Sequence, residues 1–130
     1  MISEENILFI LYVKDQSVSK DFYRNVFARD PELDVEGMTE FRLSDNCRIG
    51  LLPERNISKL LTGMPAPETG SGIPRCEMYI YVDDPDEYGS RVVNNNGRLI
   101  NGTEMRSWGD EVCYCADPDG HILAFTKIKN

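Results

Sequence analysis

The chain has 130 residues, a length typical of one domain, and 41% of them are hydrophobic. Its 22 acidic and 14 basic side chains give a net charge of −8, which repels phosphate backbones and argues against nucleic acid as a partner. No apolar run has the length of a membrane span or the form of a secretory signal, and the four cysteines have no disulfide-scaffold spacing, so we expect a cytoplasmic protein with reduced thiols and no membrane partner.

The first predicted elements are a strand and a helix. Ile7–Val13 is a short apolar run bounded by turn signals, which is typical of a strand. Asp15 or Ser17 is expected to cap a helix that follows. The helix carries apolar residues four apart, which form one stripe: Val18, Phe22 and Val26. A hairpin of Glu40–Ser44 and Ile49–Leu52 comes next.

The same order returns later in the chain. Glu77–Val82 predicts a strand, and Asp84 followed by Pro85 is a strong signal for a helix start. Asn96-Gly97 ends this helix, with the glycine expected in the left-handed conformation. A second hairpin follows, with a turn at Asp117–Gly120 between Val112–Ala116 and Ile122–Lys127.

The repeat predicts two related modules, residues 7–52 and 76–128, within a single domain of residues 1–130. Each module is too small to bury its own apolar face. The segment 53–75 between them holds four of the seven prolines and is interpreted as a linker with a short helix at Ile57–Leu61.

Four short motifs carry a resemblance to a known family. They are V-K-D at Val13–Asp15, S-x-x-F-Y at Ser19–Tyr23, V-D-D-P-D-E-Y at Val82–Tyr88 and D-P-D-G-H at Asp117–His121. In this order the chain resembles the vicinal oxygen chelate superfamily of glyoxalase I, bleomycin-resistance proteins, fosfomycin-resistance proteins and extradiol dioxygenases. The resemblance implies an α+β fold in which two βαβββ modules form a curled mixed sheet. It also implies a ligand on the concave face and a homodimer.

The resemblance places the metal ligands of metal-using relatives at three positions, which here are Leu8, Glu77 and Ala124. Leucine and alanine have no donor atom, and one carboxylate is not a coordination shell. We therefore expect no metal and no other cofactor. His121, the only histidine, is expected to close the hairpin turn rather than to act as a ligand.

Cys113 and Cys115 lie two apart, so they share one face of the predicted strand. A single C-x-C is a weak metal signal without a second pair. The resemblance implies that Val112 and Tyr114 face the cup, so both thiols are expected to face the helices as small core residues.

Strand alternation predicts the lining of the concave face. Phe9, Leu11 and Val13 are expected to meet the helices, as are Met78, Ile80 and Val82. The resemblance also places Arg42, Tyr114 and the loop of Trp108 at the cup. With the opposite side chains of the two strands they form the predicted ligand-binding set: Tyr12, Arg42, Glu77, Tyr79, Tyr81, Trp108 and Tyr114. Aromatic rings with a few polar groups are typical of an organic-ligand pocket, although Arg42 and Glu77 could instead pair with each other.

Three hypotheses follow for the function. The first is a metal-independent protein, similar to bleomycin-resistance proteins, that binds a small aromatic or cationic organic molecule. The second is a metal-dependent glyoxalase-like lyase or isomerase, or a dioxygenase, with an atypical shell that includes Glu77. Glu77 is also the one candidate for a catalytic base, since apolar surroundings would raise its pKa. The third is a domain with a collapsed cup that acts through its surface.

Overall fold

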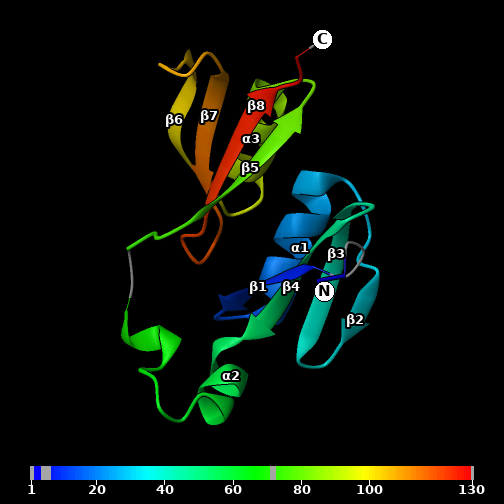
Figure 1. The fold of residues 1–130 in the computed structure, drawn as a ribbon, viewed down its shortest axis with the longest axis vertical. Coiled ribbons are helices and arrows are strands. Elements are labelled where there is room, and N and C mark those ends of the chain that lie inside the picture. The colour runs from blue at the N-terminus through cyan, green and yellow to red at the C-terminus, as the bar shows by residue number, and fades with distance from the viewer. Residues whose placement is uncertain (1, 4–6, 71–72, 130) are drawn as a thin grey trace. The chain divides into compact units, whose positions relative to one another are not determined.

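The fold consists of two consecutive βαβββ modules. The computed structural model describes residues 2–3, 7–70 and 73–129, and the chain divides into two units that hold β1–β4 and β5–β8 respectively (Figure 1). This confirms the α+β class and the duplicated module plan. That the modules form one domain stays a prediction. Within the described part of the chain, no helix is long and apolar enough to cross a membrane.

Module one contains a four-stranded mixed sheet in the order β1-β4-β3-β2. β1 pairs with β4 in parallel, and the other neighbours are antiparallel. The elements are β1 Leu8–Val13, α1 Gln16–Phe27, β2 Leu33–Val35, β3 Met38–Ser44 and β4 Cys47–Pro53. The linker contains a helix, α2 Glu54–Leu60, which begins three residues before the predicted one, and a 3₁₀ turn, η1 Pro67–Thr69.

Module two repeats this arrangement with the strand order β5-β8-β7-β6. β5 pairs with β8 in parallel, and the two hairpin pairings are antiparallel. The elements are β5 Glu77–Val82, α3 Pro85–Asn94, β6 Arg98–Met105, β7 Glu111–Ala116 and β8 Ile122–Lys127.

Aspartates begin both long helices. Asp15 Oδ1 accepts hydrogen bonds from the backbone amides of Ser17 and Val18. Asp84 Oδ1 does the same for the two amides that follow Pro85 in α3. Both caps satisfy amides that have no partner inside the helix, as the sequence predicted.

The end of α3 differs from the prediction. Asn96, with φ +70°, takes the left-handed conformation that was expected of Gly97. Asparagine tolerates this region because its short polar side chain bonds locally. Gly97 instead donates its amide to the carbonyl of Val92 and closes the last turn.

The core of module one lies between α1 and the sheet. The ring of Tyr23 packs 6.4 Å from that of Phe41, and both side chains are fully buried. Leu11 and Val13 are buried on the same sheet face, as expected. The prediction for Phe9 is wrong, because this side chain is 61% exposed. Phe9 has the correct parity, but β1 is an edge strand with a neighbour on one side only.

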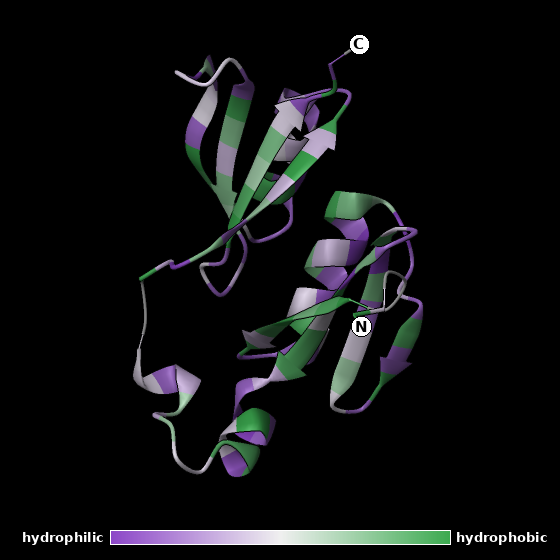
Figure 2. Cartoon of the chain, viewed as in Figure 1, coloured by the Kyte–Doolittle hydropathy of each residue, from purple (hydrophilic) through white to green (hydrophobic). Residues whose placement is uncertain are grey.

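The core of module two lies between α3 and its sheet. The ring of Tyr88 in α3 packs 5.1 Å from Phe125 in β8, on the face that also carries Cys113 and Cys115. Both cysteines are buried, which confirms their predicted orientation. Coloured by hydropathy, the strands of both units contain hydrophobic as well as hydrophilic residues (Figure 2).

Candidate functional site

The sheet face of module two opposite α3, which we call the open face, carries four of the predicted ligand-binding residues. Strand pairing places Glu77 beside Ile122, Tyr79 beside Ala124, and Tyr114 on the other side of Ala124. Tyr81 lies two residues beyond Tyr79 on the same face. The structure therefore brings these side chains to one surface.

The hydroxyl of Tyr79 is held in a polar network at this surface. It donates to Asp110 Oδ2 at 2.5 Å and accepts from Trp108 Nε1 at 2.9 Å. Lys129 Nζ lies 2.6 Å from the other oxygen of Asp110. Burial, together with the bond to Asp110, raises the pKa of Tyr79, so its hydroxyl keeps its proton at neutral pH.

Asp110 is the anionic centre of this network, and its residue is only 6% exposed. The hydrogen bond from Lys129, and then the bond from Tyr79, hold the pKa of Asp110 below its ordinary value of 3.8. Sequence reasoning missed Asp110 and Lys129. Asp110 lies two residues after Trp108, and the loop places it there because Arg106 and Asp110 are joined by a backbone hydrogen bond of 2.8 Å.

A lowered carboxyl pKa in the folded state predicts a defined pH dependence. The stabilisation from ionised Asp110 is fully present above about pH 4, the ordinary carboxyl range, and is lost as the pH falls through the lowered folded value. We therefore expect Asp110→Asn to lower the free energy of unfolding at pH 7, and this difference from the unsubstituted protein to shrink below pH 4. Urea unfolding at several pH values measures it. The exposed Asp30→Asn is the control, and a difference that is the same at pH 3 and pH 7 would contradict the assignment.

The aromatic rings around this network differ in exposure. Tyr79 and Tyr81 are in edge-to-face contact with their ring centres 5.6 Å apart. Tyr81 is 55% exposed and Trp108 is 56% exposed, so both rings offer free surface next to the half-buried Tyr79. Gly109, with φ +95°, lets the loop turn sharply directly after Trp108.

Tyr114 already holds a cation from its own chain. The guanidinium of Arg106 lies 5.1 Å from the centre of the Tyr114 ring. The same guanidinium donates to the carbonyls of Gly102 and Val112, and Arg106 Nε is a buried donor without a hydrogen-bond partner among the described residues. The Tyr114 ring is thus partly covered by a guanidinium of its own chain.

Glu77 is exposed at the first position of β5. The hypothesis of a catalytic base required apolar surroundings, and the exposed position does not supply them. The role of Glu77 in catalysis therefore stays a prediction without structural support.

The other two predicted residues lie on the sheet of module one. Tyr12 is 36% exposed on β1. Arg42 does not depend on Glu77 for a partner, because it makes a two-pronged ion pair with Glu32 at 2.7 and 3.1 Å and donates to the carbonyl of Asp45. The Glu32 pairing raises the pKa of Arg42 further and lowers that of Glu32.

The positions that the resemblance assigns to metal ligands do not form a coordination shell here. Leu8 lies on the same sheet face as Ile10 and Met38, and their side chains surround Gly50. Ala124 is fully buried between its strand neighbours. Neither position offers a donor atom, so the residues present do not fit the metal of the metal-using relatives.

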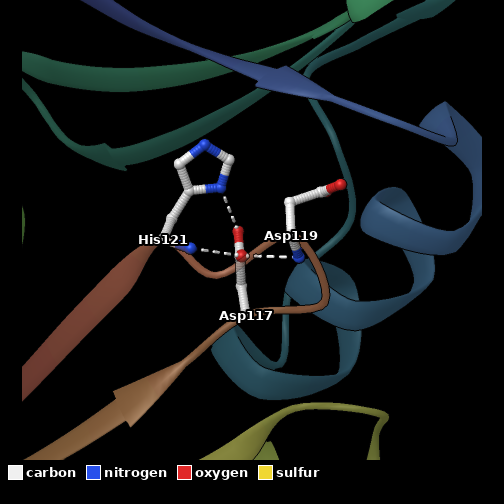
Figure 3. Close-up of side chains that lie close together, drawn as sticks. All are labelled: Asp117, Asp119 and His121. Atoms are coloured by element: carbon white, nitrogen blue, oxygen red, sulfur yellow. Dashed lines mark hydrogen bonds and ion pairs between the residues drawn. The ribbon is translucent and has the colours of Figure 1, made fainter. Parts of the chain in front are cut away.

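One cluster of metal-ligand types occurs among the described residues, at the turn between β7 and β8 (Figure 3). It contains Asp117, Asp119 and His121. Asp117 Oδ1 accepts from the backbone amides of Asp119 and His121 at 2.9 and 2.8 Å, and its Oδ2 lies 2.7 Å from His121 Nδ1. Both oxygens of the buried Asp117 carboxylate are thus bonded to groups of the turn itself. The structure thus shows His121 closing the hairpin, and it adds a bond to the imidazole that the sequence did not predict.

Comparisons with known proteins agree with this fold. The model of the glyoxalase-like domain family matches residues 6–127, nearly the whole chain. The chain belongs to the glyoxalase-like domain family. No curated protein sequence matches the chain.

Solved structures similar to this glyoxalase-like protein show the same fold. A glyoxalase-related enzyme from Fulvimarina pelagi is 19% identical with a TM-score of 0.76, covering 97% of this chain and 89% of that one. A glyoxalase/bleomycin resistance protein/dioxygenase family enzyme from Burkholderia phytofirmans is 12% identical with a TM-score of 0.79, covering 94% and 97%. A lactoylglutathione lyase from Agrobacterium tumefaciens is 19% identical with a TM-score of 0.67, covering 94% and 92%. At these identities the likeness concerns the fold alone. The family model over residues 6–127, taken together with this fold, supports the vicinal oxygen chelate superfamily.

Proposed function

We propose that this glyoxalase-like protein binds a small aromatic or cationic organic molecule on the open face of module two without using a metal. The observation that carries the proposal is a pair of exposed rings that both contact Tyr79: Trp108 bonds to its hydroxyl and Tyr81 touches its ring. Flat rings with one oriented polar group are the elements from which organic-ligand sites are built.

The two rings are suited to stacking because their partners limit their motion. Trp108 is tied through its indole nitrogen to Tyr79, and Tyr81 is in edge contact with the same residue. A ring that is already ordered loses less conformational entropy when a ligand binds. This favours a flat ligand over a flexible aliphatic one.

The electrostatics of the surface favour a cation. Glu77 lies on the same strand face as Tyr79 and Tyr81, and the whole chain carries a net charge of −8. The contact between Arg106 and Tyr114 shows that a ring on this face already accepts a guanidinium. A ligand cation over Tyr81 or Trp108 would gain the same cation–π attraction.

Metal independence rests on the chemistry of the side chains at the family's ligand positions. Leu8 and Ala124 supply no donor, which disfavours the alternative of a glyoxalase-like lyase or dioxygenase with a shell around Glu77. We also propose a homodimer in the cytoplasm, as the family resemblance and the reduced cysteines suggest.

The fluorescence of Trp108, the only tryptophan, provides the test. The protein is titrated with aromatic cations such as quaternary aryl-ammonium salts, with their neutral isosteres, and with aromatic carboxylates. We expect saturable binding of the cations, weaker binding of the neutral isosteres and none of the carboxylates. Prior dialysis against a strong chelator should leave the affinity unchanged.

Matched variants locate the site. Tyr81→Ala should weaken binding about tenfold, since one stacking or cation–π contact contributes roughly 1–2 kcal/mol. Leu60→Ala removes an exposed apolar side chain from α2 and should have no effect. Calorimetry of Trp108→Phe separates a lost optical signal from lost binding. A fluorescence response that disappears on chelation, or an affinity unchanged by Tyr81→Ala, would contradict the proposal.

A further inference from the structure

The buried face of module two contains a pair of thiols that the open face does not use. Cys113 Sγ and Cys115 Sγ lie 3.8 Å apart, and both side chains point toward α3. Each residue is at most 2% exposed, and neither forms a disulfide. The aromatic cluster lies on the opposite face of the same sheet, so the two features are independent.

A hollow of about 340 Å³ borders this pair at Cys113. It lies between α3 and β6, and Cys113 contributes to its wall. Side chains with oxygen donors line the same hollow: Asp86, Ser90 and Asn94. The hollow thus combines a sulfur donor with hard donors and room for water.

The helix has a glycine where it passes the sulfur. A Cβ atom at Gly89 would come within 3.0 Å of Cys113 Sγ, so the thiol occupies the space of a missing side chain. Glycine inside a helix costs roughly 1 kcal/mol relative to alanine. The glycine keeps the thiol in place at that cost in helix stability.

The spacing of the two sulfurs suits one bridging atom better than a direct bond. Two thiolates on one tetrahedral zinc ion, each at about 2.3 Å, are about 3.8 Å apart. A disulfide is less suited, because residues two apart on a strand have Cα atoms about 6.4–6.8 Å apart, the upper end of the range that a disulfide spans. We propose that Cys113 and Cys115 form a two-sulfur site for a thiophilic d10 cation such as Zn²⁺ or Cd²⁺, entered from the hollow between α3 and β6.

The charge balance of such a site suits its buried position. Two thiolates neutralise a divalent cation, so the bound site has no net charge to desolvate. Binding transfers the two thiol protons to solvent and forms two metal–sulfur bonds, with no change of oxidation state. Water or the oxygens of the hollow complete the coordination.

The test uses a Cys47→Ser/Cys76→Ser background, which removes the two more accessible cysteines. Zn²⁺ is titrated in competition with a chromophoric chelator. We expect one equivalent to bind, and Cys113→Ser or Cys115→Ser to weaken binding at least about tenfold, since even the loss of a group that only orients a ligand costs 10- to 100-fold. Zinc that binds equally well in both serine variants would overturn the proposal.

X-ray absorption at the zinc edge keeps the test independent of how the serine variants fold. In the background protein we expect two sulfur neighbours at about 2.3 Å. A shell of only nitrogen and oxygen would overturn the proposal and would assign the metal to the cluster of Asp117, Asp119 and His121 instead. Ligand binding on the open face is measured separately, so its failure would leave the zinc result unaffected.

Discussion

Phe41→Ala is expected to lower the free energy of unfolding by about 3–5 kcal/mol, the usual cost of removing a fully buried phenylalanine. Phe41 lies at the centre of β3, is fully buried and packs against Tyr23 of α1. Truncation removes the ring from this contact and leaves a cavity that the sheet and helix can only partly fill. Urea unfolding followed by circular dichroism measures the change.

Phe9→Ala is the matched control for this prediction. Phe9 has the same side chain in the same module and lies on the same sheet face, but it is 61% exposed. Its loss should cost about 1 kcal/mol or less, because little apolar surface is removed from a packed environment. If both substitutions lowered the free energy of unfolding equally, Phe9 would have to be buried in solution, against a surface outside the single chain.

Asp117→Ala is expected to destabilise the protein by about 2–4 kcal/mol, since buried donors left without an acceptor cost roughly 1–3 kcal/mol each. The Asp117 side chain is fully buried and accepts two backbone amides of the β7–β8 turn while contacting the imidazole of His121. The alanine variant lacks the carboxylate and so loses all three of these contacts at once. Chemical unfolding at pH 7 measures the loss.

Two further variants separate the turn from a metal site at the same residues. Asp117→Asn keeps an oxygen for the two amides and should recover much of the lost stability. Asp119→Ala should cost less than Asp117→Ala, because the bond within the cluster comes from the backbone nitrogen of Asp119 (Figure 3). Two results would instead indicate a metal site at this cluster. One is an equal loss of stability in Asp119→Ala and Asp117→Ala. The other is stabilisation by added Zn²⁺ or Mn²⁺ that requires both aspartates.

Much of the fold could be predicted because the signals were local and repeated. The cap at Asp84 with Pro85 behind it, and the turn at Asp117–Gly120 with its positive φ at Gly120, fix elements through bonds between near neighbours. The recurrence of the same order then predicted two modules. The parity of β1 and β5 placed Leu11, Val13 and Val82 in the core.

The two strands whose residues were not located from the sequence, β2 and β6, lack such signals. β2 is three residues long and exposed throughout, and β6 has no fully buried residue, so neither shows an alternating apolar pattern. Phe9 and Val18 have the spacing of buried residues but are exposed. Periodicity predicts the face on which a side chain lies, but not whether other elements cover that part of the face. Phe22 and Val26 of the same helical stripe are buried.

The side chains of the candidate site could be predicted from the sequence, but the hydrogen bonds and ion pairs between them could not. Alternation grouped Tyr79 with Tyr81 on one face, and the family resemblance added Tyr114. The network of Asp110 and Lys129 with Tyr79 joins residues up to 50 positions apart, and only the loop at Trp108 and the end of the chain bring them together. The contact between the Arg106 guanidinium and the Tyr114 ring could not be predicted either, because the sequence around an arginine in a polar loop does not indicate which ring it will cover.

The duplicated plan has a consequence for how the two halves can diverge. The sheet face turned away from the helix carries an ion pair of Arg48 with Glu40 in module one and the edge-to-face rings of Tyr79 and Tyr81 in module two. A backbone framework that is present twice lets the side chains on one copy change while the other copy keeps a polar surface. On the proposed function, exchanging the residues of this face between the two modules would move the ligand site without redesigning any strand.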